Sequence, residues 1–394
     1  MGLTSASLTP HALEGLVRLA AWIPFRRAAE VLASLTGVQV SEATARRWTE
    51  AAGEAACAVQ DEQADTIRET LPPAPLGAER LLVSADGAFV PLLHGEWAEA
   101  KLLVIGEVTT DSVGEPQTRA LTYFAQVAEA ETFSQAALVE THQRGVECAE
   151  VVCAVLDGAE WLQGLVDDHR PDAVRILDFA HAAGYVSQIG QAVQAAGTAL
   201  AQTWLTKQLH ALKHDGPAQV LSDLRVLAGA HPYLEEVQGA LAYLEKREGQ
   251  MQYPTYQAVG WPIGSGSVES GHKVVMQARL KGAGMHWNRT HVNPLLALRT
   301  VECNDRWRLG WADVGAWHQR ARSRRRHARA EARLVRICGQ LCYWYARLRV
   351  LAPPTMPHQV TPAQVGVGPL SRRPAATHPW RRPLITDRCP AAKT

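Results

Sequence analysis

The chain has 394 residues, 47% of them hydrophobic and 20% charged, which is the composition of a globular protein with two or three domains. No apolar run approaches the roughly 18 residues of a membrane-spanning helix, and the first residues lack the charged-then-apolar pattern of a secretory signal. Seven cysteines without a Cys-x-x-Cys pair indicate neither a zinc ribbon nor a disulfide framework. A reducing, cytoplasmic location and no membrane partner are therefore expected.

Charge is divided unequally along the chain, although the net charge is only +1. Residues 1–200 contain 12 Lys and Arg against 27 Asp and Glu, whereas residues 201–394 contain 28 against 12. This division predicts an anion-binding surface in the C-terminal half, with nucleic acid as the leading partner. A basic helical face without such a partner would give the same count.

The N-terminal region, residues 1–70, has a helical pattern with one specific feature, "RRAAEVLASLTGVQVSEATARRWTEAAG" (26–53). A first helix is predicted to end near Gly37, and Ser41 is suited to cap a second helix that carries Arg46 and Arg47. Two helices joined by a short turn form the helix-turn-helix layout, in which the second helix enters the DNA major groove. A helical hairpin without a DNA role is the alternative.

After the Pro-rich linker "LPPAPLG" (71–77), the pattern changes to short β-rich runs. Three of them are followed by a helix, a strand, a helix, and a strand that leads into a further helix, which predicts an α/β core with a mixed sheet over residues 78–186. A helical insertion is expected at 187–255, the rest of the core with basic helices at 256–351, and a Pro-rich tail at 352–394.

Four acidic residues occupy predicted strand ends or a helix start. Asp86, Asp157 and Asp178 lie in or after strands, and Glu269 opens a helix in "IGSGSVESGH". The ends of neighbouring strands lie along one edge of a sheet, so such acids converge in space. Carboxylates are the ligands that Mg²⁺ or Mn²⁺ prefers. For each acid taken alone, an ordinary turn residue is the alternative.

Basic and aromatic residues follow Glu269 in "WPIGSGSVESGHKVVMQARLKGAGMHW" (261–287). The small residues before Glu269 let another molecule approach the backbone closely, and together with the following cations they suit a site for a metal and a polyanion. An ordinary loop that enters a helix is the alternative. Phosphate contacts are predicted for cations on the following turns: His272, Lys273, Arg279 and Lys281. Trp287 would stack on a frayed base or belong to the core.

A second basic run, "HQRARSRRRHARAEARLVR" (318–336), also predicts phosphate binding, through Arg324, Arg325 and Arg326. The alternative for this run is a solvated helix face that pairs with the acidic N-terminal half.

The segments "SADGAFVPL", "VLDGAEW", "LDFAHA" and "IGSGSVESGHKVVMQARLKGAGMHW" resemble those of bacterial insertion-sequence DDE transposases, in the ISKra-type, Mutator-like group. The resemblance implies an RNase H-like catalytic core. It also implies that Asp86, Asp157 and Glu269 hold Mg²⁺ or Mn²⁺. "DFAH" matches the group's signature of an acid and a histidine, so Asp178 and His181 are interpreted as supporting residues. Asp178 as the second metal ligand is the alternative.

The same resemblance implies DNA cleavage and strand transfer at the terminal inverted repeats of the protein's own element, by a homo-oligomer assembled on DNA. Members of the group generally have a longer, cysteine-containing N-terminal segment, so a truncated copy or a different start is expected. Two other functions stay open. One is a transposase-derived protein that binds DNA without cutting it, and the other is a nuclease with the RNase H fold.

Overall fold

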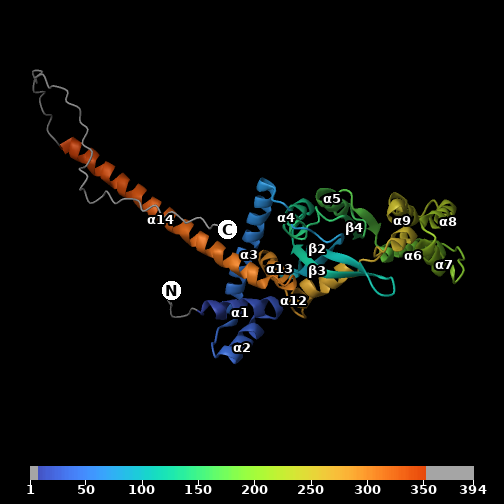
Figure 1. Ribbon diagram of the computed structural model, residues 1–394, viewed down its shortest axis with the longest axis horizontal. Helices are drawn as coiled ribbons and strands as arrows, with labels where there is room; N and C mark the ends of the chain where they lie inside the picture. Colours follow the sequence, from blue (N-terminus) through green and yellow to red (C-terminus); the bar gives the residue numbers. More distant parts are fainter. Residues whose placement is uncertain (1–7, 352–394) are drawn as a thin grey trace, which may run out of the picture. The chain divides into compact units, whose positions relative to one another are not determined.

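One mixed β-sheet organises most of the chain (Figure 1). The computed structural model describes residues 8–351, and it divides the chain into two units, residues 1–326 and 327–394. The predicted tail at 352–394 lies outside the described residues.

The sheet has five strands in the order β3-β2-β1-β4-β5. Their bounds are Arg80–Pro91 for β1, Trp97–Thr110 for β2, Pro116–Gln126 for β3, Val151–Leu156 for β4 and Val174–Leu177 for β5. The first three strands pair antiparallel, whereas β1, β4 and β5 run parallel. The predicted mixed sheet in an α/β fold is confirmed, and each β-rich run in the sequence corresponds to one strand.

The helices occupy three stretches of the described chain. Before the sheet lie α1 (Pro10–Trp22), α2 (Phe25–Thr36) and α3 (Glu42–Thr70). Within and after the parallel strands lie α4 (Ala130–Gln143), α5 (Glu160–His169), α6 (Phe179–Ala195), α7 (Trp204–His214), α8 (Pro217–Ala230), α9 (Glu235–Lys246) and α10 (Tyr253–Ala258). The last stretch holds α11 (Gly266–Gly271), a π-helix (His272–Gln277), α12 (Ala278–Leu280), α13 (Arg289–Cys303) and α14 (Trp307–Leu351), and short 3₁₀ turns occupy Leu93–Gly95 and Glu248–Gln250.

The turn between α2 and α3 forms as the sequence predicts. Gly37 takes the left-handed conformation at φ 72°, which ends α2. The Ser41 hydroxyl accepts a hydrogen bond from the Thr44 amide at 3.2 Å and caps α3. However, α3 continues to Thr70 and packs against α13, where a side chain at Gly53 would collide with the backbone of Pro294. The N-terminal helices are therefore built onto the sheet domain.

One face of the sheet is covered by α4 and α5. Leu81, Val83 and Ala85 of β1 point to this face and pack with Phe133 of α4 and Leu162 of α5. Because side chains alternate along a strand, the residues between them point to the other face. Asp86 belongs to that second face.

The second face is covered by two groups of helices. Over the parallel strands, Leu82 and Val155 pack with helices of the 179–246 stretch. Over the antiparallel strands, Leu102 packs with Val268 of α11 and Leu295 of α13. The helices that follow the last strand thus meet the acids of the strand ends on one side of the sheet.

The predicted basic helical stretch up to residue 351 consists of two long helices. The chain breaks between α13 and α14, where Asp305 has a φ of 55°. The Asn304 side chain there exchanges two hydrogen bonds with the backbone of Tyr123 on β3, at 2.8 and 2.9 Å. Within residues 8–351, no helix is both long enough and apolar enough to cross a bilayer.

Candidate active site

Three aspartates lie at the same level of the sheet, Asp86 inside β1 and Asp157 and Asp178 directly after β4 and β5. Val83 of β1 pairs with Ala154 of β4, and the Ser84 hydroxyl donates to the next carbonyl of β4 at 2.7 Å. Extending this register places Asp86 beside Asp157. The pairing of β4 with β5 ends at Leu156 and Leu177, which places Asp157 beside Asp178. Neighbouring strands lie about 4.8 Å apart, so the three residues share one edge of the sheet.

Asp86 lies between solvent and a buried histidine. Its side chain is 41% exposed, and its Oδ1 accepts a hydrogen bond from the Gly87 amide at 2.7 Å. Its Oδ2 lies 3.3 Å from Nε2 of His272, which is buried. Nε2 makes no hydrogen bond to any residue from 8 to 351. The first acid thus contacts the segment that follows Glu269.

Asp157 sits in a turn that α9 holds in place. Its Oδ1 accepts a hydrogen bond from the Ala159 amide at 2.8 Å. The Tyr243 hydroxyl donates to the carbonyl of Asp157, and Arg247 Nε donates to the carbonyl of Gly158 at 3.0 Å. Gly158 has a φ of 84°, and a side chain there would collide with Tyr243 and Arg247. Burial raises the pKa of Tyr243 to about 12, so its hydroxyl keeps its proton for this bond.

Asp178 uses both carboxylate oxygens to hold backbone amides. Oδ2 accepts from the His181 amide at 3.2 Å and caps α6, and Oδ1 accepts from the Ser265 amide at 3.0 Å. The Phe179 amide adds a hydrogen bond to the carbonyl of Ile263 at 2.9 Å. Asp178 thereby ties the start of α6 to the loop that leads into α11. This geometry supports a positioning role, whereas the His181 side chain is exposed and lies beside Tyr185.

Glu269 is brought to the same face by the close approach of α11. This helix packs against β1, β2 and β3. A Cβ atom at Gly271 would lie 2.9 Å from Leu102 and 3.0 Å from Val104, so glycine is needed there. His272, which contacts Asp86, follows Glu269 by three residues and lies on a neighbouring position of the helix surface. Glu269 itself is exposed.

The donor chemistry of this edge suits a hard cation, since all the side chains offered are carboxylates. Oδ2 of Asp157 and both oxygens of Glu269 accept no hydrogen bond from any residue between 8 and 351. The carboxylates are nevertheless not gathered into a ligand set. Across the described residues, no three His, Cys, Asp or Glu side chains meet in an arrangement that would hold a metal ion.

A family model described as Uncharacterised protein family (UPF0236) matches residues 5–311. The chain belongs to this family. The match includes the N-terminal helices, every strand of the sheet, and α11 with Glu269. A search of the curated proteins finds no match.

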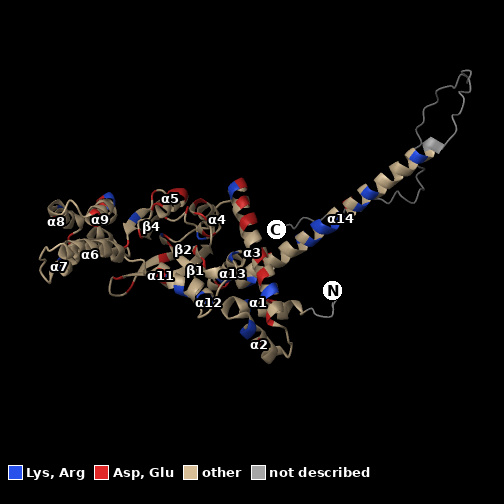
Figure 2. Cartoon of the chain, turned by 180° about the vertical axis from the view of Figure 1, so that it is seen from behind, with Lys and Arg blue, Asp and Glu red and all other residues tan. Residues whose placement is uncertain are grey.

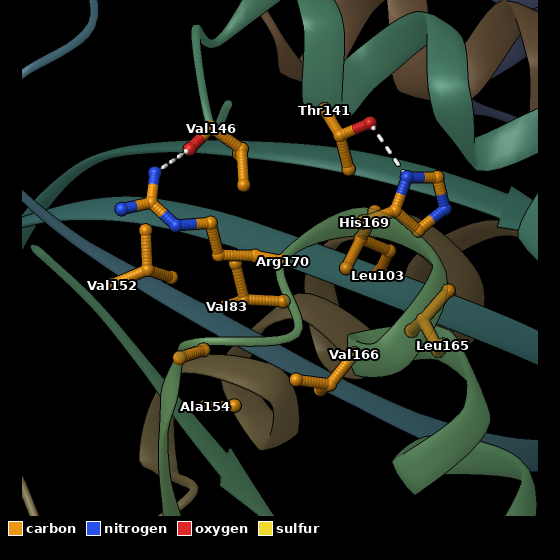
Figure 3. Close-up of a pocket in the computed structure, with 11 residues that line it drawn as sticks. Val83, Leu103, Thr141, Val146, Val152, Ala154, Leu165, Val166, His169 and Arg170 are labelled. Atoms are coloured by element: carbon orange, nitrogen blue, oxygen red, sulfur yellow. Dashed lines mark hydrogen bonds between the residues drawn. The ribbon is translucent and has the colours of Figure 1, made fainter. Parts of the chain in front are cut away.

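One enclosed cavity of this UPF0236 protein lies away from the acids. It is small, and apolar side chains of β1, β2 and β4 line it together with α4 and α5 (Figure 3). Figure 3 shows His169 beside Thr141, with Nδ1 3.1 Å from the hydroxyl oxygen. Burial lowers the pKa of His169, which favours its neutral form. The cavity opens on the α4–α5 face and is not a candidate site.

Several of the cations predicted to contact DNA are accessible in this UPF0236 protein. Arg46 and Arg47 are exposed on α3, and Lys273 and Lys281 are exposed after Glu269. Lys and Arg also recur along α14, drawn in blue (Figure 2).

The arginine run at 324–326 is exposed, but it is not entirely free. Arg324 lies 4.0 Å from Glu62 of α3, and the preceding Arg320 lies 2.6 Å from the same carboxylate. The pairing with the acidic N-terminal half, which the sequence left open, is therefore present at one end of the run.

Arg279, His272 and Trp287 are buried, so the structure does not place them to contact phosphates or bases. Arg279 is 1% exposed, lies over the rings of Phe25 and Trp287, and donates from Nε to the carbonyl of Ala20 at 2.9 Å. Burial lowers its pKa to about 10. Trp287 donates from Nε1 to a backbone carbonyl at 2.9 Å and belongs to the core, as the alternative interpretation held.

Sequence reasoning did not identify the residues that hold the site together. Tyr243 and Arg247 bind the Asp157 turn from α9, about 90 residues away along the chain, and no local pattern marks them. A signal did exist for Arg279. Val275 and Leu280 lie beside it on the helix, and both are apolar and buried.

Proposed function

We propose that this protein is a DDE transposase with an RNase H-like core, which cleaves DNA and transfers the strand at the ends of its own insertion sequence. One observation carries the proposal. Asp86 inside β1 and Asp157 directly after β4 lie at the same level of neighbouring parallel strands, on the sheet face that α11 covers with Glu269. Three carboxylates from two strands and a later helix are the set that metal-dependent phosphoryl transfer requires.

Asp86, Asp157 and Glu269 would hold Mg²⁺ or Mn²⁺. Such ions, when bound, activate a water or a 3′-hydroxyl and stabilise the leaving oxygen of phosphoryl transfer. The rest of the site positions these acids. Tyr243 and Arg247 hold the Asp157 turn, and Asp178 holds the loop before Glu269.

The surface around the site supports DNA as the substrate. Lys273 and Lys281 are exposed on the segment that follows Glu269, where phosphates of a bound strand would lie. Arg46 and Arg47 are exposed on the second helix of a helix-turn-helix arrangement, the position from which such helices contact base edges.

The test is cleavage of labelled oligonucleotides from the DNA that flanks the gene, chosen for any inverted repeat there, followed by joining to plasmid DNA. Asp86→Asn, Asp157→Asn and Glu269→Gln should each reduce cleavage by roughly three orders of magnitude or more, since each removes a ligand charge without changing shape. DNA binding, measured by mobility shift, should remain. Glu235→Gln, which alters an exposed acid at the start of α9, should cleave like the wild type.

Asp178→Asn separates the two interpretations of that residue. A positioning role predicts a loss of about 10–100-fold, less than for Asp157→Asn. If Asp178→Asn is inactive while Asp157→Asn is active, Asp178 is the second ligand. Wild-type cleavage in any variant of the three acids would remove that acid from the site.

A second function is favoured by the state of the carboxylates. Asp86 and Asp157 each accept a hydrogen bond from a backbone amide. Among the described residues, the acids are not arranged so that three of them could hold a metal ion. A transposase-derived protein that binds DNA ends without cutting would retain such a site. Such a protein would bind the terminal oligonucleotide in a mobility-shift assay. The wild-type protein would not cleave this oligonucleotide with either Mg²⁺ or Mn²⁺.

A further inference from the structure

The second unit of the chain carries an apolar stripe along α14. Five large side chains recur at alternating steps of three and four residues and are 39% to 63% exposed: Leu334, Ile337, Leu341, Trp344 and Leu348. This spacing is a heptad repeat, with leucine at each a position and Ile337 and Trp344 at d. Contiguous exposed apolar surface of this kind marks an interaction site, so the stripe indicates a partner.

The described chain does not contain that partner. Elsewhere in residues 8–348, large exposed apolar side chains occur singly or in small groups, such as Leu35 on α2 and Val226 on α8, and no other helix carries a row of them. A heptad stripe packs best against a helix with the same period, because each a or d side chain inserts between four side chains of the facing helix. The second copy of this chain offers such a helix.

We propose that further copies of the same protein cover this stripe, and that residues 330–351 of the copies associate as a parallel coiled coil. In parallel register each a residue meets its own counterpart, so Leu341 packs on Leu341. The positions flanking the stripe allow this register. Arg333 at g faces Cys338 of the other helix at e, so no two arginines oppose each other there. The inference does not depend on the proposed chemistry.

The composition of the stripe also indicates the number of helices. Leucine at a with isoleucine at d favours more than two strands over a dimer. The large Trp344 at a d position also needs a wider interior than a two-stranded coil provides. We therefore expect an assembly of three or four copies through this segment.

Sedimentation of the full-length protein without DNA, in high salt, tests the proposal. The wild type should sediment as an oligomer. Leu341→Glu combined with Leu348→Glu places charges inside the coil and should raise the dissociation constant at least about 100-fold. Val335→Glu is the matched control, because Val335 is 68% exposed on the same helix but off the stripe. Its association should be unchanged.

A monomeric wild type, or equal dissociation by Val335→Glu, would overturn the proposal. Circular dichroism of each variant checks that the sheet domain remains folded. Association that persists in the double variant would show that another surface joins the copies. This outcome would also contradict the proposed coiled coil.

Cross-linking tests the orientation. In a background with serine at the exposed Cys148, Cys338 and Cys342, and at Cys389, Leu341→Cys should form an intermolecular disulfide on mild oxidation. Val335→Cys, off the stripe, should not. An oligomer in which Leu341→Cys fails to cross-link would exclude the parallel register.

Discussion

Two basic segments of this protein lie in opposite environments. The cations after Glu269 include Arg279, which is buried against two aromatic rings, whereas the arginine run at 324–326 faces solvent on α14. The difference follows from their neighbours. Arg279 has apolar residues one helical turn before it and one residue after it, while the neighbours of the arginine run are mostly polar and basic, with only alanines between them. The surroundings of a basic side chain therefore decide whether it binds an anion or stabilises the fold.

The largest effect that tests this comparison is expected at Arg279. Arg279→Ala should lower the free energy of unfolding by about 3 kcal/mol, because it leaves a cavity between Phe25 and Trp287 and removes the donor to the Ala20 carbonyl. Arg325→Ala should change it by less than about 0.5 kcal/mol. Denaturant unfolding of both variants measures the difference. Equal values would show that the two environments do not differ energetically.

A smaller effect is expected at Gly271 of α11, which determines how closely this helix approaches the sheet. Gly271→Ala should cost about 1–2 kcal/mol, since the added Cβ would lie 2.9 Å from Leu102. Gly239→Ala is the matched control. It lies in α9 with open space around it, so alanine should stabilise the protein by up to about 1 kcal/mol through helix propensity. The same denaturant measurement applies, and stabilisation by Gly271→Ala would contradict the close contact.

The smallest effect concerns the exposed run and appears in the salt dependence of DNA binding. Replacing Arg324, Arg325 and Arg326 together with alanine should weaken binding to all sequences alike and reduce the log–log salt slope by up to about 2–3. Titrations at several salt concentrations measure the slope. Arg225→Ala, at an arginine paired with Glu245, is the control and should leave it unchanged.

If the slope is unchanged in the triple variant, the run has no role in phosphate binding. Its contact with Glu62 would then be its only described function.

Features with a local cause were predictable from the sequence. The left-handed Gly37 and the Ser41 cap are set by residues within four positions of each other, and the strands by their alternating patterns. The proximity of Asp86 and Asp157 followed from the rule that acids in or after neighbouring strands converge along one edge of a sheet. These parts of the fold and of the candidate site need no knowledge of tertiary contacts.

Features with a distant cause were not predictable. The turn at Asp157 depends on Tyr243 and Arg247 of α9, and the loop before Glu269 depends on Asp178. The π-helix at His272–Gln277 changes which side chains point inward, and no sequence pattern predicts this change from ordinary helical spacing. In each case the deciding contact joins residues that the sequence separates widely or rotates out of phase.

The carbonyls that end α1 make the N-terminal helices inseparable from the sheet domain. Arg279 donates to Ala20, and the buried Arg299 of α13 donates to Ala21 at 3.3 Å. Deleting α1 would leave two buried guanidinium groups without these acceptors. A domain that is joined to its neighbour only by a flexible linker can be exchanged without loss of packing contacts. In this architecture, a graft of a foreign N-terminal module would have to restore both acceptors before the fused protein could fold.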